Sequence, residues 1–326
     1  MEFATKNRFI ILALAIVIFA VPSFARGKKD SDRATYATSE ELSKQNSIPI
    51  EISIEPAEGH DAISLPEEQS TAEQPEAAQT VPLLSDISSL EIPLCPATRS
   101  PNENASGHEV HAYTGFELCY REEYEEAEWV SYLLTKEELT KVIDRTNDFR
   151  ADTKISTGSA TPQDYTNSGY DRGHLAPAAD MEWSEKSVHD SFLMSNMTPQ
   201  TPQFNRGIWK ELEEQVRLWA KKFGSVYVVT GPVLEKNSES YAHIGLNEVT
   251  VPDFFYKVLL AQCSDEQHTI IGIGFIIPNQ KCDGTLFDYV VSIDDIELRT
   301  GLDFFSLLPD NIEIPLEEKT DTTDWK

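Results

Sequence analysis

The sequence predicts an α+β domain built on a central antiparallel sheet that helices flank. Three observations predict this class. Segments with strand-like alternation and segments with helical periodicity follow one another in mixed order. Several strand-like segments are close enough along the chain to pair as hairpins, and the longest periodic segment is amphipathic. The length of 326 residues allows one large domain or two ordinary ones.

Residues 1–25 predict a secretory signal peptide. Lys6 and Arg8 precede the apolar run Phe9–Val21, and the residues that end at Ala25 are typical of a cleavage site. The apolar run is shorter than the roughly 20 residues that a membrane-spanning helix needs. We therefore expect an exported protein, either periplasmic or extracellular.

Residues 26–106 predict a disordered acidic linker. This segment is rich in Ser, Glu, Ala, Pro and Gln, with almost no aromatic residues and no sustained apolar period. Such a composition buries too little apolar surface to offset the entropy lost on ordering. Two short alternating pieces, Ile48–Ile54 and Val81–Ile92, leave open an added edge strand or a partner-binding segment.

The predicted domain spans residues 107–312, and residues 313–326 are expected to form a flexible acidic tail. Strand-like alternation is expected at His111–Tyr120, Glu128–Leu134, Arg172–Leu175, Val226–Thr230, Phe254–Cys263 and Thr269–Ile277. Helices are expected at Lys136–Val142, at Glu185–Met194 behind Ser184, at Arg206–Phe223, and between Ser292 and Gly301. The apolar residues of the third helix recur with the helical period, so that face should pack against a core.

The net charge of −28 is unusual for a protein that would bind a polyanion. Its distribution reduces the conflict, because residues 145–222 hold 10 Lys or Arg against 11 Asp or Glu, a balance of −1. Residues 106–326 as a whole hold 19 against 39, so most of the acid lies outside the span that carries the motifs described below. We expect a near-neutral cleft with weak, salt-sensitive binding of phosphates.

The four cysteines are compatible with an oxidising compartment, where three pairings are possible. They are Cys95, Cys119, Cys263 and Cys282. A bridge between Cys263 and Cys282 is not expected, because the predicted strands put them at opposite ends of a hairpin arm. The spacing does not resemble a zinc site. Buried free thiols are the alternative to disulfides.

Residues 171–174, Asp-Arg-Gly-His, and Asn205 carry groups suited to phosphodiester hydrolysis, which needs a base, a divalent cation and a fixed positive charge. His174 can be the base, because an ordinary pKa of about 6.5 leaves imidazole largely neutral at pH 7. Arg172 would lie on the same face of an extended segment, where a guanidinium can grip two phosphate oxygens. Asn205 offers a carbonyl oxygen to Mg²⁺, which accepts only one or two protein ligands.

Three motifs in this part of the chain resemble, in order and spacing, those of the DNA/RNA non-specific endonuclease family, which includes the Serratia nuclease and mitochondrial endonuclease G. They are Asp-Arg-Gly-His-Leu-Ala-Pro at 171–177, Asn-Met-Thr-Pro-Gln at 196–200, and Asn205 followed by Trp209 and Glu213. Members share a ββα-metal active site. The resemblance runs from about residue 110 to about residue 309, with further landmarks at 230–232, 251–257 and 300–305.

The resemblance implies an Mg²⁺-dependent endonuclease that cuts DNA and RNA, leaves 5′-phosphate ends and accepts Mn²⁺ in place of Mg²⁺. It implies that His174 is the general base, Arg172 the clamp on the phosphate and the transition state, and Asn205 the direct Mg²⁺ ligand. Asn196 would position the site, and Glu213 would orient the hydrated metal without touching it. These two complete the predicted catalytic set with His174 and Arg172.

Some assignments stay open on the sequence alone. The family expects a further phosphate-binding arginine upstream of the Asp-Arg-Gly-His motif, and both Arg145 and Arg150 fit, with Arg145 preferred. Asn205 precedes a helix, where Asn is also a favoured N-cap. For the whole chain, two alternatives are a non-catalytic binding module that keeps the fold and a phosphodiesterase for a substrate other than nucleic acid.

Overall fold

The computed structural model of the chain describes residues 81–95 and 107–326. The predicted signal peptide, the piece Ile48–Ile54, and residues 26–80 and 96–106 of the predicted linker lie outside the described residues. Within the described ranges, no helix combines the length and apolar character needed to cross a membrane.

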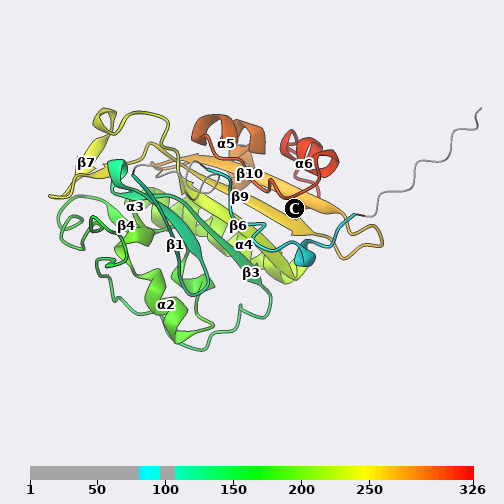
Figure 1. The fold of residues 1–326 in the computed structure, drawn as a ribbon, viewed down its shortest axis with the longest axis horizontal. Coiled ribbons are helices and arrows are strands. Elements are labelled where there is room, and N and C mark those ends of the chain that lie inside the picture. Colours follow the sequence, from blue (N-terminus) through cyan, green and yellow to red (C-terminus); the bar gives the residue numbers. More distant parts are fainter. Residues whose placement is uncertain (1–80, 96–106) are drawn as a thin grey trace, which may run out of the picture. The chain divides into compact units, whose positions relative to one another are not determined.

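A seven-stranded antiparallel sheet forms the centre of the described domain (Figure 1). Its strands, in spatial order, are β1 (His108–Ala112), β2 (Glu117–Arg121), β3 (Glu126–Thr135), β6 (Ser225–Pro232), β9 (Phe254–Gln262), β10 (Ile270–Pro278) and β11 (Val290–Val291). Two small antiparallel pairs accompany it: β4 (Asp171–His174) with β5 (Met197–Gln200), and β7 (Ala242–Ile244) with β8 (Val249–Val251). The predicted α+β class with a central antiparallel sheet is confirmed.

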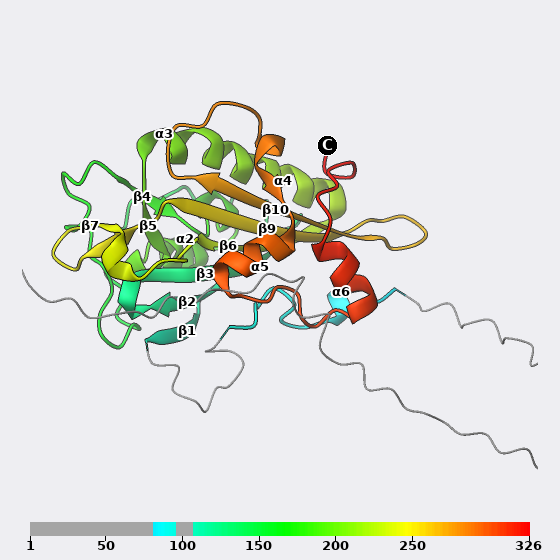
Figure 2. The ribbon, with the colours of Figure 1, turned by 90° about the horizontal axis from the view of Figure 1, so that it is seen from above.

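Helices cover both faces of this sheet. They are α2 (Glu185–Ser191), α3 (Pro202–Phe204), α4 (Lys210–Phe223), α5 (Ile293–Thr300) and α6 (Asp310–Glu317). Figure 2 shows α4 on one side of the sheet and α5 with α6 on the other. The two predicted caps are confirmed, since the hydroxyl of Ser184 accepts from Ser187 N and that of Ser292 accepts from Asp295 N.

Alternating side chains of the central strands build a core on each face. In β6, Val226 and Val228 pack in the core on the α4 side, whereas Tyr227 and Val229 pack in the core shared with α5 and α6. A strand buried on both faces has a continuous apolar sequence, which is easy to recognise. The predicted bounds of β3, β6, β9 and β10 therefore match the structure to within two residues.

Two local predictions were wrong. The predicted strand His111–Tyr120 is a hairpin, whose turn is closed by a hydrogen bond from Tyr113 N to Phe116 O and by Gly115 at φ +92°. The predicted helix Lys136–Val142 is a turn followed by irregular chain. There the Glu138 carboxylate accepts from Thr135 N and Oγ1, and such local bonds compete with helix formation.

Residues 81–95 belong to the domain, so the linker prediction was wrong for them. Leu84, Leu90 and Cys95 are buried in the core shared with α5 and α6. Backbone groups of this segment are also bound: Tyr227 Oη donates to Leu84 O, and Gln262 Nε2 donates to Pro82 O. The apolar piece from residue 81 to 92 forms no edge strand but includes a short 3₁₀ helix, Leu84–Asp86.

Replacing Leu84 by alanine should lower the free energy of unfolding by about 2 to 5 kcal/mol, because a buried leucine is lost and a cavity remains. Its neighbour Leu83 is 42% exposed and gives a matched control, for which the change should stay within about 0.5 kcal/mol. Urea unfolding of the two variants measures both values. Equal, small effects would show that residues 81–95 do not contribute to the folded core.

The C-terminal segment is also packed, so the expectation of a flexible tail was wrong. Helix α6 extends to residue 317, and Trp325 is 1% exposed. The ring of Trp325 lies edge-on to Trp219 of α4, with centroids 4.9 Å apart, and its carbonyl accepts from Trp219 Nε1 at 2.6 Å. The apolar area of one tryptophan is enough to hold the chain end despite its acidic neighbours.

Candidate active site

A cleft of about 390 Å³ brings together five of the residues that the sequence predicted for the site. They are Arg145, Arg172, His174, Asn205 and Glu213. Three further basic residues line the same cleft, namely Arg206, Lys210 and Arg217. The five predicted residues come from the loop after β3, from β4 and from the helical segment after β5, so the fold is what assembles them.

The β4–β5 pair fixes the directions of Arg172 and His174. Two residues apart on one strand, they share a face, while Gly173 between them faces the other way and pairs with Thr198. A Cβ on Gly173 would lie 2.1 Å from the side chain of Gln200, which is fully buried. The glycine is therefore required for β4 and β5 to approach each other.

Two phenylalanines form a wall that holds the catalytic candidates. The His174 ring centroid lies 5.0 Å from that of Phe192 and 5.7 Å from that of Phe149. The guanidinium carbon of Arg172 lies 4.5 Å from the Phe149 centroid, and that of Arg145 lies 5.6 Å from the Phe192 centroid. Cation–π contacts therefore support both arginines without using their N–H donors.

His174 is only 8% exposed, and its Nε2 atom has no hydrogen-bond partner among the described residues. Burial, assisted by the positive charge of Arg145, lowers the pKa of His174 from 6.5 to about 3. The imidazole is consequently neutral at pH 7. A neutral ring with an uncommitted nitrogen can accept a proton.

The lowered pKa makes His174 a source of acid destabilisation. Below pH 6.5 the unfolded chain binds a proton at this ring and the folded chain does not, so stability is complete above about pH 6.5 and is lost as the pH falls toward 3. Between pH 8 and 5 the loss from this group should be about 2 kcal/mol, at 1.36 kcal/mol per pKa unit. Urea unfolding of wild type and His174→Ala in EDTA should show this excess pH dependence in wild type alone; parallel curves would contradict it.

The structure distinguishes the two arginine candidates. Arg145 lines the cleft, and no salt bridge or hydrogen bond to its guanidinium occurs among the described residues. Arg150 does not line the cleft. Its Nη1 donates to the carbonyl of His189 at 2.9 Å and contacts the Asp148 carboxylate at 3.2 Å, so it joins the loop to α2. The geometry therefore favours Arg145 over Arg150 for phosphate binding, and the assignment stays a prediction.

Asn205 lies in a π-helical turn, Asn205–Trp209, between α3 and α4. Such turns occur frequently at functional sites. Asn205 is not an N-cap, because its backbone is helical and Thr201 caps α3 instead. Its Nδ2 donates to Asp171 Oδ2 at 2.9 Å, which leaves the carbonyl oxygen without a partner among the described residues. Asp171 also forms a two-bond ion pair with Arg206, so its role is structural.

Glu213 lines the cleft from α4 beside a buried charged network. Burial raises the pKa of Glu213, while the nearby Lys257 opposes the shift. Lys257 is 1% exposed, and its Nζ has no hydrogen-bond partner among the described residues and lies 4.7 Å from the Trp209 ring centroid. Arg217 is held by Asp180 at 2.7 Å. The half-buried Glu213 can orient water that enters the cleft.

Asn196 does not line the cleft, so the structure gives it no contact with the space where a substrate would lie. It is fully buried, and its amide is saturated by backbone groups. Its Oδ1 accepts from Ala176 N, while its Nδ2 donates to Ala176 O and Ser191 O. It therefore positions the chain that follows His174, which is the part of the prediction that the geometry supports.

Sequence reasoning missed the aromatic wall and the additional basic residues. Lys257 could have been found from the sequence, because a lysine inside an apolar strand indicates a buried charge that needs a partner nearby. The sequence indicated Arg217 more weakly, since it lies four residues after Glu213 on the same helix face. Nothing in the sequence indicated a site role for Phe149 and Phe192, because aromatic residues are common in any core.

Comparisons with known proteins found one matching family and several relatives. Residues 96–311 match the family described as DNA/RNA non-specific endonuclease. The mitochondrial nuclease EXOG of Danio rerio is 36% identical over 215 residues, which are 62% of this chain and 62% of that protein. Mitochondrial endonuclease G of Homo sapiens is 37% identical over 198 residues, 57% of this chain and 66% of that protein.

Two further matches cover more of the related protein. A nuclease of Nostoc sp. is 31% identical over 256 residues, 74% of this chain and 90% of that protein. A crystal structure described as the EndoG/EndoGI complex has a TM-score of 0.57 and 32% identity, and the match covers 62% of this chain and 88% of that chain. Against the zebrafish and human mitochondrial proteins, by contrast, this chain spans slightly less than two thirds of their length.

Proposed function

The chain belongs to the DNA/RNA non-specific endonuclease family, and from this premise we propose that it is a metal-dependent endonuclease that hydrolyses phosphodiester bonds of both DNA and RNA. One observation carries the proposal. A single cleft holds a neutral, buried histidine, two arginines that lie against aromatic rings, and an asparagine oxygen, and neither the guanidinium groups nor this oxygen has a hydrogen-bond partner among the described residues.

His174 acts as the general base in this proposal. The imidazole accepts the proton of a water molecule that attacks phosphorus, because the ring is neutral and the Phe149–Phe192 wall fixes its plane. Burial lowers the pKa of the ring, and the negative charge of a phosphate in the cleft would act in the opposite direction.

Arg172 and Arg145 bind phosphate oxygens. The other cleft cations are already engaged, Arg206 by Asp171, Arg217 by Asp180 and Lys210 by Glu214. Contacts to phosphates carry no sequence information, so we expect little sequence preference and no distinction between the two sugars. Arginine can hold two oxygens at once, which suits a phosphoryl group whose charge shifts during reaction.

The donors in the cleft fit Mg²⁺, with Mn²⁺ as a substitute. Asn205 would hold the ion directly through its carbonyl oxygen, which Asp171 orients by binding the amide nitrogen, and Glu213 would hold waters of the ion. A bound divalent cation supplies charge neutralisation at the leaving oxygen. Departure of the 3′ oxygen would leave 5′-phosphate ends.

We also propose that the protein is exported. The support is the N-terminal sequence, in which Lys6 and Arg8 precede an apolar run and small residues lead to Ala25. Mass spectrometry of protein recovered from the periplasm or medium should find a chain that begins at residue 26. An intact N-terminus in the cytoplasmic fraction would contradict export.

The salt dependence of substrate binding tests the charge distribution of the cleft. With two or three phosphates neutralised, the affinity for duplex DNA should fall with a log–log slope of roughly −2 to −3, at about 0.9 per contact. Michaelis constants between low and physiological salt at fixed Mg²⁺ give the slope. Arg172→Ala should reduce its magnitude by about 1, while Arg150→Ala should leave it unchanged. A wild-type slope near −8 would require an extended basic groove.

The proposed function is tested by digestion of supercoiled plasmid and ribosomal RNA with Mg²⁺ or with EDTA. Nicking of the plasmid, fragmentation of the RNA and loss of both in EDTA are expected, with ends that a kinase labels only after phosphatase treatment. Tight DNA binding without cleavage would favour the binding module. Cleavage of a simple phosphodiester without action on either polymer would favour the phosphodiesterase alternative.

A further inference from the structure

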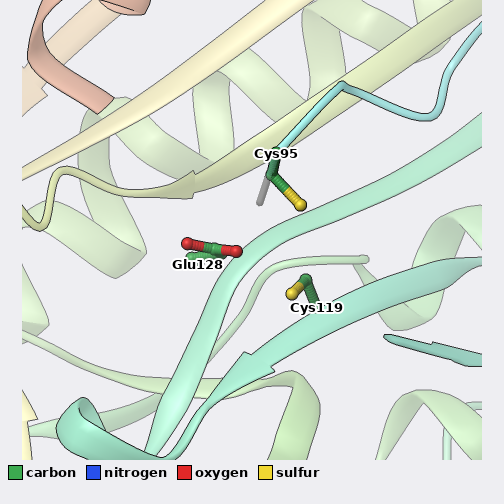
Figure 3. A group of neighbouring side chains, drawn as sticks. All are labelled: Cys95, Cys119 and Glu128. Atoms are coloured by element: carbon green, nitrogen blue, oxygen red, sulfur yellow. The ribbon is translucent and has the colours of Figure 1, made fainter. Parts of the chain in front are cut away.

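A second group of side chains with metal-binding atoms lies in the core shared by the sheet with α5 and α6. The Sγ atoms of Cys95 and Cys119 and a carboxylate oxygen of Glu128 lie within 4.8 Å of one another. Figure 3 shows the three side chains gathered around one spot, from the segment before β1, from β2 and from β3. Both cysteines are fully buried, Glu128 is 7% exposed, and none of the three lines the cleft.

A histidine adjoins the same group. His108 of β1 has Nδ1 at 2.9 Å from Glu128 Oε1 and at 3.9 Å from Cys119 Sγ, and its side chain is 14% exposed. Two sulfurs, one imidazole nitrogen and one carboxylate oxygen are therefore contributed by four separate stretches of chain. Their separation along the sequence explains why cysteine spacing alone gave no zinc signature.

A β-bulge directs Glu128 into this group. In the β2–β3 pairing, Cys119 is opposite Trp129 and Tyr120 is opposite Ala127, which leaves Glu128 as the extra residue. Regular alternation would send residues 128 and 129 to opposite faces, whereas a bulge redirects a side chain and disturbs the ladder. The irregularity thus brings a carboxylate against two buried sulfurs.

The charges of the group match a divalent cation. Two thiolates and one carboxylate with a divalent ion leave one negative charge. The guanidinium of Arg121, with Nη1 at 3.7 Å from Glu128 Oε2, balances it.

We propose that Cys95, Cys119 and Glu128 form a buried site for one thiophilic divalent cation of the zinc class. His108 supplies the fourth donor. Tetrahedral zinc with bonds of about 2.0 to 2.3 Å needs ligand atoms roughly 3.3 to 3.8 Å apart. His108 Nδ1 lies 2.9 Å from Glu128 and 3.9 Å from Cys119, and the atoms of the other three residues lie within 4.8 Å of one another, so small side-chain movements would bring the donors to that spacing. Thiolate donors select zinc-like ions over Mg²⁺, so this site and the cleft would not compete for the same metal.

Binding at this site is proton exchange without redox change. The cation replaces one proton on each of the two thiols, two metal–sulfur bonds form, and two protons pass to solvent. A disulfide would instead remove two hydrogens and would use neither Glu128 nor His108. Because Cys95 follows the bridge between Leu94 and Asp303, the bound ion would fasten residues 81–95 to the sheet.

The full chain, purified with a phosphine reductant and without chelators, provides the test. Elemental analysis after zinc loading and dialysis should find one equivalent of Zn²⁺, and Co²⁺ in its place should give a thiolate-to-metal charge-transfer band. Cys119→Ser should abolish both signals, and Glu128→Gln or His108→Ala should weaken zinc binding about 10- to 100-fold. The matched control Cys263→Ser/Cys282→Ser should retain both.

Two controls keep the outcome interpretable. Asn205→Ala should retain the full equivalent of Zn²⁺, because the cleft is a separate site. The cobalt spectrum of the wild type needs no variant, so it decides the question even where Cys119→Ser fails to fold. Absence of the charge-transfer band in the folded wild type would overturn the proposal. So would a peptide map, made without reductant, in which Cys95 and Cys119 are joined as a disulfide.

Discussion

Replacing His174 by alanine should lower the turnover number by about 10²- to 10⁴-fold, the range for loss of a general base. The reason lies in the geometry of the cleft, which His174 lines with a neutral, largely buried imidazole. Single-turnover cleavage of plasmid DNA at saturating Mg²⁺ measures the chemical step without a contribution from product release.

The matched control for this variant is His243→Ala. His243 is exposed, has one weak hydrogen bond to Ser238 at 3.3 Å and does not line the cleft, so its loss should leave turnover within a few-fold of wild type. Circular dichroism at pH 8 shows whether the His174 variant keeps its fold. Added imidazole should restore part of the activity, because the space between Phe149 and Phe192 can accept the free ring. A folded variant with near wild-type turnover would rule out His174 as the base.

The local motifs were predictable because their geometry is set within a few residues. Arg172 and His174 share a face of a strand whatever the rest of the chain does, and the requirement for Gly173 between them follows from one contact with Gln200. Strands buried on both faces and capped helices were predictable for the same reason, since alternation and caps are local patterns.

The remaining features depend on contacts between distant segments. Arg145 and Arg150 have similar local sequence, and only the packing of α2 against the loop shows that Arg150 is occupied by the carbonyl of His189. The acidic composition around Trp325 predicts a flexible tail, whereas the structure places the ring of Trp325 edge-on against Trp219. Leu84 and Leu90 are too few to give a periodic pattern, yet each fills a place in an existing core. A chain can thus contribute core residues from a segment whose composition predicts disorder.

Charge patterning was informative in part. The near-neutral balance of residues 145–222 agrees with a cleft in which three of five cations are paired with carboxylates. The count could not show which cations stay uncommitted. That depends on Asp171 and Asp180, which bind Arg206 and Arg217 and leave Arg172 and Arg145 for phosphate.

Asn205→Ala should raise the Mg²⁺ concentration for half-maximal activity by at least roughly 10- to 100-fold, the range already seen when a group that only orients a metal ligand is lost. The variant removes the carbonyl oxygen that Asp171 orients through the amide nitrogen. Because Mg²⁺ keeps most of its waters and uses few protein ligands, the loss of a single donor is a large fraction of its protein contacts. Initial cleavage rates over a wide Mg²⁺ range, at constant ionic strength, measure the shift.

Asn205→Asp separates ligand loss from charge. It keeps an oxygen donor but adds a negative charge beside phosphate and beside Asp171, so it should bind the metal while its Michaelis constant for DNA rises. The exposed Asn237 gives a neutral reference for the alanine change. If Asn205→Ala leaves the Mg²⁺ titration unmoved while lowering turnover, the residue positions the Asp171–Arg206 pair instead of the ion. The metal must then be held by other groups of the cleft, and the carboxylate of Glu213 is the oxygen donor among them.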